Sequence, residues 1–130
     1  MPEYLSHDWM QEALKLADGI QPRPGNSIVI QHVVTDCPAG APDIRWYQAI
    51  NDGRFSDIAL GEHSAPDVTV TETYEVSLKL NSGRMSPSAA FLSGKVKPRG
   101  NVPKMMSMTP LLQSPDFKAW DDARAAMTDS

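Results

Sequence analysis

The chain has 130 residues, of which 41% are apolar and 22% charged, a balance typical of one globular domain with a single core. Its net charge of −4 argues against nucleic acid as a general partner, and its apolar runs are too short for a membrane span. Cys37 is the only cysteine, which excludes an internal disulfide, and Met1 begins no signal-peptide pattern. We therefore expect a single domain over residues 1–130, located in the cytoplasm.

An amphipathic helix is predicted from Tyr4 to Gly19. Ser6 is a candidate N-cap, and apolar side chains recur at helical spacing through Leu5, Trp9, Ala13, Leu16 and Ile20. A stiff linker rich in proline and glycine, residues 21–25, leads from this helix into the sheet.

Three strands with alternating side chains follow. The first, Ser27–Asp36, is partly apolar on both faces, which predicts a central strand covered on both sides. The hairpin signal of residues 51–53 joins the second, Asp43–Ile50, to the third, Arg54–Gly61. His32 shares an apolar face of the first strand. We interpret it as a hydrogen-bonded core histidine, and a polar anchor inside a ligand cavity is the alternative.

A series of turn, cap and break signals occupies residues 67–100. A strand is predicted over Asp67–Thr71, after which Thr71 can cap a helix whose first turn begins with Glu72. Gly83 sits where a left-handed residue would end that helix, and Ser86-Pro87 restarts the chain as a second helix. The run Ala89-Ala90-Phe91-Leu92-Ser93-Gly94-Lys95-Val96-Lys97 then leads into a strand predicted over Gly94–Lys97.

The order of these motifs resembles the sterol carrier protein-2 family of lipid-binding domains. The strand entry at residues 66–69, the restart at Ser86-Pro87, and the family's A-F-x-x-G-K-hydrophobic-K pattern followed by Gly100 are all present. The resemblance is clear over residues 67–100 and extends to residues 26–112. It implies an α+β fold, in which helices cover a five-stranded, mainly antiparallel sheet and enclose a hydrophobic cavity. Pro98 stands where relatives keep a strand residue, so the last strand should be short or at an edge.

Two more helices are predicted after Gly100. Asn101 caps the first, which Pro110 should end or kink. Its methionines lie at helical spacing, a pattern that usually means packed core, whereas the resemblance places this helix in the cavity wall. The second helix, residues 114–127, begins at Ser114-Pro115. It would lid the cavity, pack on the sheet or mediate association, and the sequence leaves these three roles open.

The resemblance implies noncovalent binding or transfer of a long apolar ligand, such as a fatty acid, acyl-CoA, phospholipid or sterol. The alternative is an association or accessory module of a larger enzyme system, without a ligand of its own. No enzyme activity, metal or cofactor is expected, because the sequence has no nucleophile–base motif, phosphate-binding loop or metal-ligand spacing. Transient contact with an anionic membrane and a homodimer are both compatible with the sequence.

The candidate ligand-binding residues are mostly large and apolar: Trp46, Tyr74, Phe91, Met105, Met106, Met108, Leu112 and Phe117. Lys95, Lys97 and Arg99 are candidates for binding an anionic headgroup, since the run from Arg84 to Pro115 holds five basic residues and no acidic one. An ordinary solvated strand edge is the alternative interpretation of these cations.

Overall fold

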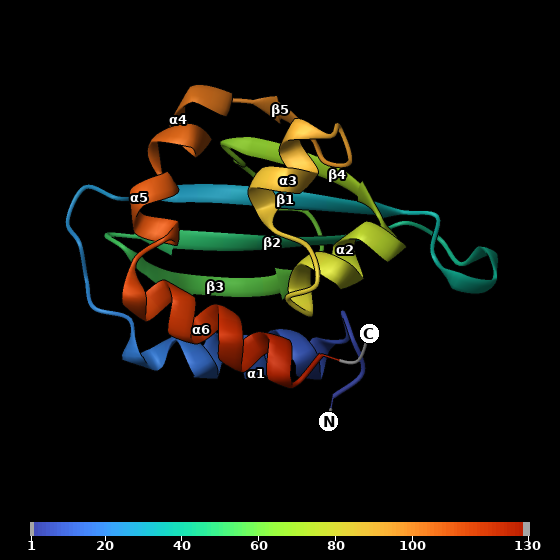
Figure 1. The fold of residues 1–130 in the computed structure, drawn as a ribbon, viewed down its shortest axis with the longest axis horizontal. Coiled ribbons are helices and arrows are strands. Elements are labelled where there is room, and N and C mark those ends of the chain that lie inside the picture. Colours follow the sequence, from blue (N-terminus) through green and yellow to red (C-terminus); the bar gives the residue numbers. More distant parts are fainter. Residues whose placement is uncertain (1, 129–130) are drawn as a thin grey trace.

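The computed structural model describes residues 2–128, and its centre is one five-stranded sheet with helices packed against it (Figure 1). The strands lie in the order β3-β2-β1-β4-β5. Their bounds are β1 Ile28–Thr35, β2 Ile44–Asn51, β3 Arg54–Leu60, β4 Val68–Thr73 and β5 Lys97–Gly100. Strands β1 and β4 run parallel, and all other neighbours run antiparallel. The predicted α+β fold with a mainly antiparallel sheet is confirmed.

Strand β5 lies later in the chain than predicted, and the predicted bounds Gly94–Lys97 were wrong. Gly94 has a φ of 74°, and the Lys95 N–H donates to the Ala90 carbonyl at 2.9 Å, so these residues close a helix instead of entering the sheet. Pro98 pairs with Val70 in the strand at the edge of the sheet. This agrees with the prediction of a short edge strand, where a missing N–H is tolerated.

Helix α1 is shorter than predicted and spans His7–Leu16, followed by a 3₁₀ turn over Ala17–Gly19. Ser6 caps it as expected, with Oγ accepting from the Trp9 N–H at 3.2 Å. Leu5 has a φ of 61°, which lies outside the helical region, so the chain enters the helix only after it. Helix α1 packs against α6, Pro115–Ala126. The Trp120 indole N–H of α6 donates to the Ala13 carbonyl of α1 at 2.8 Å.

Helix α2 spans Tyr74–Asn81 and is capped by Thr73, not by Thr71 as the sequence predicts. The Thr73 hydroxyl accepts from the Val76 N–H at 3.2 Å. The prediction failed because β4 stays paired with β1 up to Thr73, and ladder pairing keeps the backbone extended past the first capping signal. Glu72 is therefore a buried strand residue and does not belong to the first turn of a helix.

The remaining caps follow the sequence closely. Ser86 caps α3, Pro87–Leu92, and Gly83 has the left-handed φ of 80° expected at the preceding break. Asn101 caps α4, Val102–Ser107. The helix predicted across the methionines is divided, because Met108 separates α4 from α5, Thr109–Leu112, in which Pro110 occupies the first turn.

The helices gather on one side of the sheet. In Figure 1, α3, α5 and α6 lie over the same face, and α1 lies beside α6 near β3. Strand β1 is central in the sheet, as predicted. On its other face Gln31 is buried and hydrogen-bonds to Gly61 and His63, but Val29 and Val33 are only half-buried, so cover on both sides is confirmed only in part. The core is built around Trp9, Trp46 and Phe117, which are almost completely buried. Within residues 2–128, no helix combines the length and the apolar character needed to cross a membrane.

Candidate functional site

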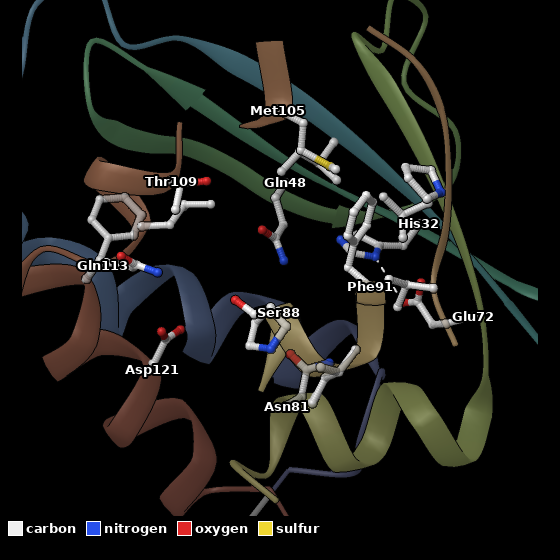
Figure 2. A pocket seen from close by; sticks show the side chains of 18 of the residues that line it. His32, Gln48, Glu72, Asn81, Ser88, Phe91, Met105, Thr109, Gln113 and Asp121 are labelled. Carbon is white, nitrogen blue, oxygen red and sulfur yellow. Dashed lines mark hydrogen bonds and ion pairs between the residues drawn. The ribbon is translucent and has the colours of Figure 1, made fainter. Parts of the chain in front are cut away.

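A cavity of about 650 Å³ lies between the sheet and the helices (Figure 2). This volume falls in the range of ~300–1,000 Å³ typical of small-molecule sites. Ile30, Trp46 and Val70 border it from three neighbouring strands, and Met105 and Leu112 border it from α4 and α5. The sheet thus forms one wall of the cavity, and the helices after β4 form the opposite wall.

Most of the apolar residues singled out in the sequence border this cavity: Trp46, Phe91, Met105, Met106, Leu112 and Phe117. Two of them lie elsewhere. Tyr74 packs edge-on against Tyr4, with ring centroids 5.7 Å apart, and Met108 is 4% exposed within the core. The methionines around α4 therefore differ in their surroundings: Met105 borders the cavity, whereas Met108 packs in the core.

Phe55 and Trp120 border the cavity as well, although the sequence did not suggest them. Their rings pack together with centroids 4.4 Å apart. Phe55 sits opposite Ile50 because the pairing of β2 with β3 shifts its register between Ala49 and Ile50. Regular alternation of side chains does not reveal a bulge of this kind, so the sequence could not predict that Phe55 points toward the cavity.

The cavity wall also contains many polar side chains, which sequence reasoning missed apart from His32. They include Gln48, Asn81, Ser88, Thr109, Gln113 and Asp121, and Figure 2 shows them distributed around the space. They come from strands and helices far apart in the chain, and only the fold brings them together. The cavity is thus apolar in its large surfaces and polar at several defined points.

His32 and Glu72 form a buried pair on the sheet wall. The register of β1 with β4 places both side chains on the same face, and His32 Nδ1 lies 3.0 Å from Glu72 Oε1. The Glu72 side chain is 2% exposed and that of His32 15%. The His32 ring also stacks on Trp46, with centroids 4.2 Å apart and planes within 10°. The predicted hydrogen bond of His32 is confirmed, and the same residue borders the cavity.

A second polar network lies behind Asn81. Its Nδ2 donates to the Tyr4 hydroxyl at 2.8 Å and to the Ser77 carbonyl at 3.0 Å, and the Tyr4 and Ser77 hydroxyls are 2.6 Å apart. Burial raises the pKa of Tyr4 well above its ordinary value. The phenol is therefore held in its neutral form, in which it can both donate and accept a hydrogen bond.

Arg124 lies on the α6 side of the cavity. Its Nη2 is 2.9 Å from Asp121 Oδ1, and its guanidinium lies over the Trp120 ring at 4.2 Å from the centroid. Burial lowers the pKa of Arg124 and raises that of Asp121, because both charged forms lose solvation there. The ion pair compensates part of this loss and holds the Arg124 side chain against the wall.

The exposed apolar residues Phe91, Leu92 and Met106 border the cavity from α3 and α4, and Leu92 is 84% exposed. Lys95, Lys97 and Arg99 are exposed close by in the sequence. Pro98 borders the cavity, so strand alternation turns Lys97 and Arg99 to the opposite face of β5.

The basic run of the sequence is partly neutralised in space. Lys104 Nζ lies 3.0 Å from Asp67 Oδ1, an acidic residue far from it in the sequence. Glu75 has a lowered pKa, chiefly through its bond to Lys79 and to a smaller extent through Lys95 and Arg84. A stretch without acids therefore overstates the positive charge of this surface. Among residues 2–128, His, Cys, Asp and Glu side chains form no cluster suited to a metal ion.

The sequence profile of the SCP-2 sterol transfer family matches residues 10–113. Sterol carrier protein 2 of Rattus norvegicus is 32% identical over 83 residues, which cover 64% of this chain and 15% of the rat protein. The match thus spans only a small part of that relative's length.

Solved structures show the same fold. A crystal structure of sterol carrier protein 2 superposes with a TM-score of 0.72 at 13% identity, covering 98% of this chain and all (100%) of that one. The solution structure of palmitated SCP2L2 from Aedes aegypti gives a TM-score of 0.60 at 19% identity, covering 82% of this chain and 90% of that one.

Proposed function

Because the chain belongs to the SCP-2 sterol transfer family, we propose that it binds a long apolar ligand in its cavity and transfers it without chemical change. The observation that carries the proposal is the cavity of about 650 Å³ between the sheet and the helices. Burial of a chain contributes ~0.8 kcal/mol per methylene, so a dozen methylenes supply about ten kcal/mol before the loss of ligand freedom is subtracted. Fatty acids, acyl-CoA, phospholipids and sterols all have enough apolar surface.

The proposed contacts of the apolar chain are the candidate residues that border the cavity: Trp46, Phe91, Met105, Met106, Leu112 and Phe117. Methionine side chains are unbranched and polarizable, so they adapt to chains of different shape. Met105 is half-buried and Met106 is 50% exposed, which leaves both able to change conformation as a ligand enters.

The proposed site of exchange is the surface formed by Phe91, Leu92 and Met106. Exposed apolar side chains at the edge of a cavity are suited to contact with a lipid surface. Lys95 lies next to this surface in the chain, and it is our first candidate for an anionic headgroup. Lys97 and Arg99 would act from the opposite face of β5, as part of a broader attraction to anionic lipid.

Displacement of a fluorescent fatty-acid analogue tests the proposal. The folded protein should bind the analogue saturably, with micromolar or better affinity. Leu112→Trp should weaken binding by filling the cavity, whereas Gln11→Trp, at an exposed position of α1, should not. Absence of saturable binding by the folded, monomeric wild type would overturn ligand carriage.

That negative result would favour the second candidate function, an association or accessory module. The observation behind this candidate is that the match covers only 15% of the rat sterol carrier protein 2, so the same kind of domain occurs within a longer chain. In that case the cavity-filling variant should leave all binding properties unchanged.

A further inference from the structure

The His32–Glu72 pair leaves half of its hydrogen-bonding capacity unused. Glu72 Oε1 bonds to His32 Nδ1, but Glu72 Oε2 and His32 Nε2 are buried and have no hydrogen-bond partner among residues 2–128. Trp46 Nε1, on the ring stacked against His32, is in the same condition. All three side chains border the cavity. Among residues 2–128, three of the four buried side-chain nitrogen and oxygen atoms without a partner thus lie on these neighbouring side chains, and the fourth, Arg124 Nε, lies on the α6 side of the cavity.

Such a concentration is unfavourable unless something binds there. A buried polar group without a partner costs free energy, and a charged group costs more. Glu72 is the most deeply buried acidic side chain that borders the cavity, at 2% exposure. A pair that served only to join β1 to β4 would leave Glu72 Oε2 and His32 Nε2 buried with a desolvation cost that nothing offsets. The arrangement instead provides a site for a polar group on whatever occupies the space.

The hydrogen-bonding types define which group fits. A carboxylate only accepts, so His32 donates through Nδ1 and its Nε2, in the neutral ring, is an acceptor. Glu72 Oε2 is a second acceptor, and the Trp46 indole N–H is a donor. A group that donates one hydrogen bond and accepts another satisfies this combination. A hydroxyl does both, whereas a methyl group does neither and a second carboxylate brings like charge to Glu72.

We propose that His32, Glu72 and Trp46 form a subsite for an uncharged hydroxyl group carried by the lipid ligand. The hydroxyl donates to Glu72 or His32 and accepts from the Trp46 indole. The proposal rests on the function proposed above and specifies its ligand class: lipid alcohols and hydroxylated chains are preferred to plain chains, and a carboxylate is disfavoured at this point. Figure 2 shows His32 and Glu72 together at one side of the cavity, away from Gln113 and Asp121.

Three matched probes test the subsite by displacement of the fluorescent analogue. They are palmitate, omega-hydroxypalmitate and the dicarboxylate of the same chain length, each also measured in shorter and longer versions. All three carry a carboxylate at one end and differ only at the other end, which is a methyl group, a hydroxyl or a second carboxylate. At the best length we expect the hydroxylated probe to bind at least about fivefold more tightly than palmitate, and the dicarboxylate more weakly than palmitate.

The double variant His32→Phe with Glu72→Leu should bind palmitate at least as well as the wild type and lose the preference for the hydroxyl. Apolar replacement of a buried charged group together with its partner is often neutral or stabilising, so a folded variant is expected, and near-UV circular dichroism checks it. In Glu72→Gln the carboxylate charge is absent, so binding of the dicarboxylate should recover. Thr71→Val removes a hydroxyl from the opposite face of β4, outside the cavity lining, and should leave all three ratios unchanged.

The outcomes separate the two proposals. Saturable palmitate binding without a hydroxyl preference, or with one that persists in the double variant, overturns the subsite and leaves ligand carriage intact. Failure of the wild type to bind any of the probes overturns ligand carriage, and the subsite with it. A hydroxyl preference lost in the double variant and kept in Thr71→Val supports both.

Discussion

Arg23 and Asp116 form a two-point ion pair that ties the linker before β1 to the first turn of α6. Arg23 Nη2 lies 2.7 Å from Asp116 Oδ1, and Nη1 lies 3.2 Å from Oδ2. The Gln21 N–H donates to the same carboxylate at 2.9 Å. The bond to Arg23, followed by that to Gln21, holds the pKa of Asp116 well below its usual range. The pair therefore positions α6, which carries Phe117 and Trp120 into the cavity wall.

We expect Asp116→Asn to lower the melting temperature modestly at neutral pH. The folded pKa of Asp116 is depressed, so its contribution to stability is present above the unfolded pKa and is lost as pH falls through the folded pKa. The difference between wild type and variant should therefore shrink in strong acid. Thermal unfolding across a pH series measures this, with Asp122→Asn, at an exposed position of α6, as the matched control. A difference that stays constant down to low pH would contradict the interpretation.

Met105 and Met108 should respond differently to truncation. Met108 is packed core, so Met108→Ala should cost ~2–5 kcal/mol of unfolding free energy and leave the ligand chain-length preference unchanged. Met105 borders a cavity that already exists, so Met105→Ala should cost less and shift that preference. Chemical denaturation and binding of fatty acids of graded length give both quantities. Equal destabilisation, with no shift for either variant, would remove α4 from the binding site.

Charge reversal should separate headgroup attraction from binding of the apolar chain. Lys95→Glu and Lys97→Glu should weaken binding to anionic vesicles and acyl-CoA more than binding of a neutral ligand. The effect should decrease as salt is added, because exposed charges are screened over ~10 Å at 0.1 M. Lys15→Glu, at an exposed position of α1, is the matched control. An equal loss of binding in the control would show that the net charge of the protein, and not the position of these two lysines, determines the attraction.

Tyr4→Phe should destabilise the fold by about 1–3 kcal/mol, because it leaves the Asn81 amide and the Ser77 hydroxyl without their shared partner. The pKa of Tyr4 is raised by burial, so its contribution is complete below the unfolded pKa and is lost as pH rises through the folded pKa. The wild type should consequently lose more stability than the variant at alkaline pH. Urea unfolding at neutral and alkaline pH provides the comparison, and parallel losses in both proteins would argue against the assignment.

Local signals predicted much of this fold because their physics is local. Ser86 and Asn101 cap their helices wherever the rest of the chain lies, and Gly83 adopts the conformation that its missing side chain permits. Thr71 shows the limit of such reasoning. It has the side chain of a cap, but pairing of β4 with β1 continues past it, and long-range hydrogen bonds overrule the local preference.

The candidate site could be predicted only in part for the same reason. Large apolar residues are expected to pack against other apolar groups, and most of those chosen from the sequence do border the cavity. Glu72, Asn81 and Arg124 look like ordinary polar residues of a strand and two helices. Their meeting around one space depends on how β4, α2 and α6 are placed, and no spacing along the chain contains that information.

The parallel pairing of β1 with β4 also has a consequence for the order of folding. Strands β1, β2 and β3 pair antiparallel with their neighbours in sequence, so this meander closes only short loops. The connection from β3 must cross β2 and β1 before β4 can pair with the far edge of β1. Such long-range closure is the slow step in chains of this kind. His32 meets Glu72 only at that step. We therefore expect the ligand-binding wall to assemble late, and substitutions in this pair to slow folding, because they weaken a contact that forms in the slow step.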